Sequence, residues 1–98
     1  MAKGYWIAHN EVTEPEAYKL YIAANGPIFA KFGARFLVRG GAGETVEGDL
    51  PPRHVVIEFP DHATAVACYR SPEYAEAKKL RENASRGFVV VVEGYDPP

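Results

Sequence analysis

Two kinds of apolar pattern alternate along this chain, and their order constrains the fold more than any single motif does. Four short segments are rich in β-branched and aromatic residues and are predicted to be strands: Tyr5–Asn10, Arg35–Gly40, His54–Phe59 and Phe88–Glu93. After the first and third of them, apolar residues recur every three or four positions, which predicts helices. The predicted order is therefore strand, helix, strand, strand, helix, strand.

The first predicted helix has a start signal, an internal break and a stop signal. Thr13 and Glu16 fit a capping box, in which each side chain bonds a free backbone N–H at the helix start. Asn25-Gly26-Pro27 predicts a kink, because proline removes an internal hydrogen bond. Gly33 suits the left-handed conformation that ends many helices.

The second helical region is predicted to begin at Pro60-Asp61 and to be interrupted at Ser71-Pro72. Its second piece runs from Pro72 to about Ala84, with Ser71 as the cap and Gly87 as the end of the region. Helical spacing places Arg81 on the same stripe as Tyr74. A guanidinium facing the core needs an acidic partner, carbonyl groups or an anionic ligand, since burying it unpaired is costly.

This order is the ferredoxin-like βαββαβ arrangement, so we expect one α+β domain over residues 1–98. Right-handed crossovers place the helices on one face of a four-stranded antiparallel sheet. Apolar residues nevertheless occupy both faces of the strands: Val55 and Ile57 point to one side and Val56 to the other. The second face therefore needs a cover, and a homodimer that packs sheet against sheet is the simplest one.

Composition excludes several classes of function. The net charge is −2 without a basic cluster, so we expect no nucleic-acid partner. Cys68 is the only cysteine, so it cannot form an intramolecular disulfide, and we expect it to be a buried apolar residue in a cytoplasmic protein. No apolar run is long enough to cross a membrane, and we expect no membrane partner.

Five short segments in sequence resemble one family. They are Gly4–Ala8, Pro15–Tyr18, Gly33–Gly41, Val56–Pro60 and Tyr69–Tyr74. Together they are similar to an uncharacterised bacterial family known as domain of unknown function 1330. The resemblance implies membership of the dimeric α/β-barrel superfamily, in which two ferredoxin-like subunits join their sheets. Other branches of that superfamily include muconolactone isomerases, cofactor-free monooxygenases, haem-degrading enzymes and stress-responsive dimers. The resemblance implies no particular activity, because this family has no agreed one.

The predicted topology brings several polar residues to one end of the sheet. His9, Arg39 and His54 lie at strand ends there, and the helices bring Tyr18 and Arg81. Arginine binds carboxylates and histidine can move a proton near neutral pH, so this end would suit a small organic anion. The alternative is structural: Arg39 would pair with a glutamate of the following turn, and His9 with Glu11.

Three further residues complete the candidate set, and each has a structural alternative. Glu58 is a candidate base, although we favour an ion pair with Arg35 on the neighbouring strand. Asn25 is a candidate ligand contact, although we favour a bond to the backbone groups that Pro27 frees. Tyr74, like Tyr18, is a ligand candidate of a type that is more often part of a core. The catalytic candidates are thus His9, His54 and Glu58; the ligand-binding candidates are Arg39, Arg81, Tyr18, Tyr74 and Asn25.

We expect neither a metal nor a cofactor. The three histidines lack metal-ligand spacing, and Gly40-x-x-Gly43 precedes a strand, whereas dinucleotide fingerprints open a helix. Two functions remain. The first is a cofactor-free enzyme, of the isomerase, tautomerase or monooxygenase kind, acting on a small organic acid. The alternative is a non-catalytic dimeric module that binds a metabolite or serves in a stress response.

Overall fold

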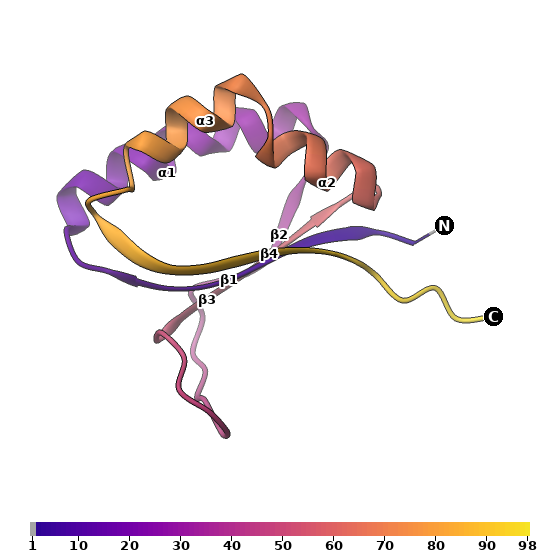
Figure 1. Ribbon diagram of the computed structural model, residues 1–98, viewed down its shortest axis with the longest axis horizontal. Helices are drawn as coiled ribbons and strands as arrows, with labels where there is room; N and C mark the ends of the chain where they lie inside the picture. Colours follow the sequence, from indigo (N-terminus) through magenta and orange to yellow (C-terminus); the bar gives the residue numbers. More distant parts are fainter. Residues whose placement is uncertain (1) are drawn as a thin grey trace.

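The computed structural model describes residues 2–98 and consists of a four-stranded antiparallel sheet with helices over one face (Figure 1). The strands are β1 (Gly4–Val12), β2 (Arg35–Arg39), β3 (Arg53–Phe59) and β4 (Ser85–Glu93), and the helices are α1 (Pro15–Lys31), α2 (His62–Tyr69) and α3 (Pro72–Lys79). The strand order is β2-β3-β1-β4. This is the predicted ferredoxin-like arrangement, with the second helical region divided at Ser71 into α2 and α3.

Trp6 of β1 is the centre of the core between the sheet and the helices. Its ring lies 5.1 Å from that of Phe29, 5.4 Å from that of Phe59 and 5.0 Å from that of Tyr74, measured between centroids. The indole Nε1 donates a hydrogen bond to the carbonyl of Ala65 at 2.9 Å, which satisfies the one polar atom of this side chain. One aromatic residue therefore joins the sheet to all three helices.

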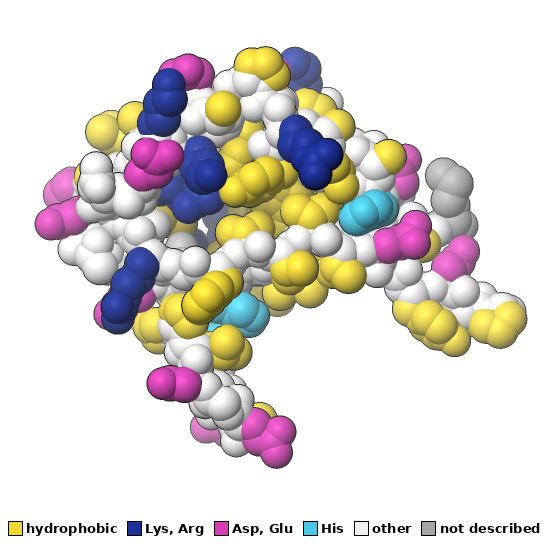
Figure 2. Space-filling model, in the orientation of Figure 1, with side chains coloured by type: hydrophobic (Ala, Val, Ile, Leu, Met, Phe, Trp, Pro, Cys, Tyr) yellow, Lys and Arg dark blue, Asp and Glu magenta, His cyan; other side chains and the backbone are white. Residues whose placement is uncertain are grey.

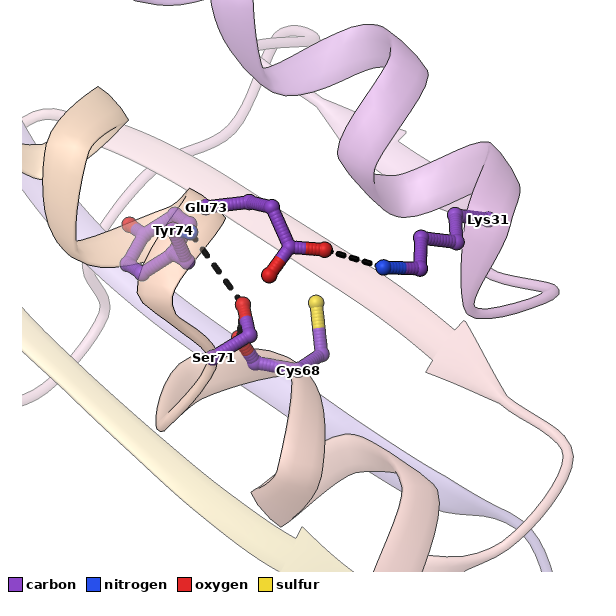
Figure 3. Close-up of polar contacts among 5 residues, drawn as sticks. All are labelled: Lys31, Cys68, Ser71, Glu73 and Tyr74. Carbon is purple, nitrogen blue, oxygen red and sulfur yellow. Dashed lines mark hydrogen bonds and ion pairs between the residues drawn. The ribbon is translucent and has the colours of Figure 1, made fainter.

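Ser71 caps α3 as the sequence predicts (Figure 3). Its Oγ accepts a hydrogen bond from the Tyr74 backbone N–H at 3.1 Å and donates one to the Cys68 carbonyl at 2.8 Å. Two residues after Ser71, Glu73 forms an ion pair with Lys31 and so links α3 to α1. Cys68 is buried, and this burial, together with nearby Glu73, raises the pKa of its thiol to about 12. The thiol is therefore protonated at neutral pH and is not a nucleophile.

Replacing Ser71 with alanine is expected to lower the free energy of unfolding by about 1–2 kcal/mol, since the cap and the bond to Cys68 are both lost. Urea unfolding followed by circular dichroism measures this change. Ser85→Ala is the control, because the Ser85 hydroxyl forms a single long bond of 3.3 Å to the Arg81 carbonyl. Equal effects of the two substitutions would show that the cap is not a significant source of stability.

The start of α1 differs from the prediction. Glu14, not Thr13, is the N-cap, and its side chain forms no capping bond. The backbone N–H groups of Thr13 and Glu14 instead bond the carbonyl of Ala84, at 2.8 and 3.0 Å. A contact distant in sequence thus fixes this helix start and replaces the local capping box. The helix then continues through Pro27 to Lys31, so the predicted interruption does not end it.

Gly87 does not end a helix. The helix α3 stops at Lys79, short of the predicted Ala84, and a turn follows in which the Ala84 N–H bonds the Arg81 carbonyl at 3.0 Å. Gly87 lies inside β4, opposite Asn10, with a φ of 158°. A Cβ there would lie 2.1 Å from the carbonyl oxygen of His9. Glycine is therefore needed for the close approach of β4 to β1.

Among residues 2–98, no helix covers the second face of the sheet, here called the open face (Figure 1). Several of its exposed side chains are apolar. At its centre Ile7 is paired with Val56 on β3 and Val90 on β4. Val90 is 51% exposed and Phe88 is 66% exposed. Apolar side chains thus lie on both faces of the strands, as the sequence predicts. Within residues 2–98, none of the helices combines the length and the hydropathy that crossing a bilayer requires.

Candidate functional site

A cavity lies between the sheet and the helices, and Figure 2 shows it as a hollow with yellow and dark blue side chains. The space open to the centres of water molecules is about 70 Å³, which is room for several waters or for a molecule of a few non-hydrogen atoms. Core aromatic rings, among them Trp6 and Phe29, form much of the wall. The polar part of the wall comes mainly from arginines, tyrosines and asparagines.

Arg81 enters the cavity from the turn after α3. Its Nε and Nη2 donate to the Tyr74 hydroxyl at 3.4 and 3.3 Å, and its guanidinium carbon lies 5.5 Å from the centre of the Tyr21 ring. Burial lowers the pKa of Arg81, but the contacts with Tyr74 and Tyr21 more than offset that effect and the pKa is raised. The side chain is thus a half-buried permanent cation whose hydrogen bonds are long.

Arg53 and Arg39 belong to the sheet side of the cavity. Arg53 shares a face with Val55, and its Nη1 lies 3.4 Å from the Tyr18 hydroxyl. Arg39 is paired with Val55 on the neighbouring strand, and its guanidinium stacks at 4.1 Å on the Phe36 ring. A register shift between Phe36 and Val38 brings Arg39 to the same face as Phe36. The two arginines therefore enclose the cavity from β2 and β3.

These three cations have no balancing carboxylate among residues 2–98. The wall contains no aspartate or glutamate, and none of Arg39, Arg53 and Arg81 forms an ion pair within that part of the chain. A fourth arginine of the wall, Arg86, does pair with Glu11, with Nε and Oε1 2.7 Å apart. Each guanidinium has five N–H donors, and most of those of the three unpaired arginines are uncommitted. The cavity is therefore suited to an anion.

Two tyrosine hydroxyls meet inside the cavity. The hydroxyls of Tyr21 and Tyr74 are 2.7 Å apart. Burial raises the pKa of Tyr74, and Tyr21 adds to this rise while Arg81 opposes it, so the phenol is protonated at neutral pH. Because Tyr74 accepts from Arg81, it can donate to Tyr21, which leaves the Tyr21 proton for a bound group.

Two asparagines have unpaired oxygens at this site. Asn10 donates through Nδ2 to the Tyr18 hydroxyl at 3.0 Å, but its Oδ1 is buried without a hydrogen bond. The Oδ1 of Asn25 is likewise buried and unpaired. Among residues 2–98, no hydrogen bond joins the Asn25 side chain to the backbone, so our favoured interpretation of this residue, that it satisfies groups freed by Pro27, is wrong.

The structure brings together all five ligand-binding candidates of the sequence analysis. Arg39, Arg81, Tyr18, Tyr74 and Asn25 line this one cavity. The contacts of Arg39 are with Phe36, and among residues 2–98 it has no glutamate partner of the kind that the structural alternative required.

The three catalytic candidates lie elsewhere, on the open face. His9 and His54 contact each other there, with 2.8 Å between their Nδ1 atoms, and Glu58 pairs with Arg35 at 2.8 Å. The ion pair is the interpretation that we favoured for Glu58. Strand direction places the histidines at the predicted end of the sheet, but side-chain alternation turns them away from the cavity. Their expected partnership with Arg39 and Arg81 is therefore wrong.

Three residues that line the cavity were not among the predicted site residues: Arg53, Asn10 and Tyr21. A signal for the first two was present, because alternation along a strand places Arg53 on the face of Val55 and Asn10 on that of Trp6. Across the described part of the chain, no three His, Cys, Asp or Glu side chains are grouped as a metal site would need.

The fold and the cavity define a ferredoxin-like α+β protein with a cationic pocket between sheet and helices. The sequence profile of "Domain of unknown function (DUF1330)" matches residues 3–95, and the chain belongs to this family. No curated protein is significantly similar to the chain in sequence.

Solved structures share the fold at low sequence identity. A protein of unknown function from Rhodopseudomonas palustris is 21% identical, with a TM-score of 0.72 over 98% of this chain and 85% of that one. SnoaB, a cofactor-independent oxygenase from Streptomyces nogalater, is 12% identical, with a TM-score of 0.65 over 99% and 97%. A dimeric ferredoxin-like protein of unknown function from Thermobifida fusca is 16% identical, with a TM-score of 0.59 over 94% and 89%.

Proposed function

We propose that this protein binds a small organic acid in the cavity between its sheet and its helices. The observation that supports the proposal is the set of three arginines without a carboxylate: Arg39, Arg53 and Arg81. Arg53 and Arg81 are half-buried and Arg39 is exposed, and a carboxylate ligand would form charge-assisted hydrogen bonds with their uncommitted N–H groups. The aromatic wall suits the hydrocarbon part of such an acid.

The proposed form of the protein is a cytoplasmic homodimer joined through the open faces. An exposed apolar sheet face is a common sign of a protein interface, and a second copy offers a matching surface. The structurally similar protein from Thermobifida fusca is described as dimeric, which supports a dimer but does not indicate the surface that forms it.

Calorimetric titration with butyrate tests the binding proposal, and butyramide is the control ligand because it has nearly the same shape without the charge. Butyrate is expected to bind about tenfold or more tightly than butyramide, since its charge-assisted bonds to arginine are lost in the amide. Equal affinities, or no heat from butyrate, would reject an anion site.

A cofactor-free enzyme acting on the same acids is the second candidate. The Tyr21–Tyr74 hydroxyl pair favours it, because a protonated phenol beside a bound carboxylate can donate a hydrogen bond to a neighbouring carbonyl oxygen. Such a bond makes the adjacent C–H more acidic, and water can then remove that proton. The fold shared with SnoaB is compatible with cofactor-free chemistry but does not assign it to this chain.

The rate at which the C3 protons of 2-oxobutyrate exchange in D₂O, monitored by proton NMR, distinguishes the enzyme from the binding module. The enzyme hypothesis predicts faster exchange with the protein than without it, and a loss of about tenfold or more in Tyr21→Phe, which removes the hydroxyl that is free to donate to the ligand. Tyr95→Phe is the control, because Tyr95 is 85% exposed on the C-terminal tail. An exchange rate unaffected by the protein would leave the binding module as the function.

A further inference from the structure

The side-chain oxygen of Asn25 is buried and has no hydrogen-bond partner among residues 2–98. The residue is 4% exposed, its side chain lines the cavity, and it forms no hydrogen bond with other residues of the described chain. Burial of an unpaired amide is unfavourable, and nearly all buried polar groups in proteins have a partner. A ligand in the cavity is the partner that this geometry offers.

The local structure of α1 does not explain this amide. Pro27 leaves the carbonyl of Ala23 without its helical hydrogen bond, but the Asn25 side chain does not donate to it. Asn25 instead follows Tyr21 by four residues, so both side chains project from one face of the helix into the cavity.

The size of the cavity limits the size of the ligand. The Arg81 guanidinium carbon lies 5.5 Å from the Tyr21 ring centre, and Asn25 follows Tyr21 by about one helical turn along α1. Both Arg81 and Asn25 line the cavity, in which the space open to the centres of water molecules is about 70 Å³. A ligand that bonds both residues is therefore a short molecule.

We infer that the ligand is a short hydroxy acid, with its carboxylate on Arg81 and its hydroxyl on Asn25. This inference rests on the proposed anion-binding function and adds a second group of the ligand that the protein recognises, the hydroxyl. A hydroxyl both donates and accepts, so it can bond the amide oxygen and the amide NH₂ alike. An unsubstituted acid of the same length leaves the amide unpaired, and a site with unpaired polar groups discriminates against such a ligand.

Calorimetric titration of 3-hydroxybutyrate and butyrate, with wild type and Asn25→Leu, tests the inference. Wild type is expected to bind 3-hydroxybutyrate about tenfold more tightly than butyrate. In Asn25→Leu this preference should disappear, because leucine has a similar size but offers no hydrogen bond. Butyrate should bind the variant at least as tightly as it binds wild type.

The outcomes distinguish the two proposals. If wild type binds both acids equally, or if Asn25→Leu keeps the preference, the hydroxy-acid inference is overturned while the anion site stands. If neither acid binds wild type, both proposals fail. The wild-type comparison does not depend on whether the variant folds.

Discussion

Arg81→Gln is expected to weaken the binding of butyrate by about 10- to 100-fold, because the substitution removes a bidentate, charge-assisted hydrogen bond to the carboxylate. Glutamine retains polar character and much of the side-chain length, and the bonds from Arg81 to Tyr74 are long at 3.3 and 3.4 Å. The fold should therefore survive. The backbone carbonyl of Arg81, which accepts from Ala84 and Ser85, is unchanged by the substitution. Calorimetric titration measures the affinity, and circular dichroism monitors the fold.

Arg70→Gln is the matched control. It removes the same charge from an exposed residue at the end of α2 that does not line the cavity. Its affinity for butyrate should remain within about twofold of wild type, because an exposed charge at that distance is largely screened by salt. If both variants lose affinity for butyrate equally, the loss comes from the change in net charge and not from a contact between Arg81 and the ligand. If neither does, Arg81 is not the anchor.

Val90→Lys is expected to convert the proposed homodimer into a monomer. Val90 lies at the centre of the open face, opposite Ile7, and is 51% exposed in the single chain. In a dimer joined through this face, each copy would bury one unpaired ammonium group, and such burial costs several kcal/mol. The dimer dissociation constant should rise by about 100-fold or more, since about 1.4 kcal/mol corresponds to each factor of ten. Sedimentation velocity at micromolar concentration measures the change.

Leu20→Lys provides the comparison for this experiment. Leu20 is 60% exposed on α1, in the helical layer on the other side of the molecule, and the same change there should leave the dimer intact. A wild-type protein that sediments as a monomer would contradict the dimer directly. A Val90→Lys protein that remains dimeric would place the interface on another surface.

The order of strands and helices could be predicted because it depends on local patterns. β-Branched runs such as Phe88–Glu93 and the Ser71-Pro72 cap carry their signal within a few residues. Features that depend on contacts distant in sequence were not predictable in this way. The start of α1 is held by the Ala84 carbonyl, and Gly87 serves the packing of β4 against β1. Both contacts join residues that are far apart in the sequence, so neither can be inferred from the residues beside them.

The candidate site was only partly predictable for the same reason. A helical stripe predicted an interior position for Arg81, and the residue does line the cavity, although α3 ends at Lys79 and Arg81 lies in the turn that follows. Strand direction correctly placed His9 at the same end of the sheet, but the face on which it lies follows from side-chain alternation, which puts it on the face of Ile7 and away from Trp6. The position of Arg39 depends on a register shift, and a regular alternating pattern would have placed it on the opposite face.

A crystal structure of the protein with 3-hydroxybutyrate tests the central claim most directly, because it locates the bound acid. We predict density in the cavity between sheet and helices, with the carboxylate within hydrogen-bond distance of the Arg81 guanidinium. An acid bound at the outer surface, or at the His9–His54 pair on the open face, would contradict this account.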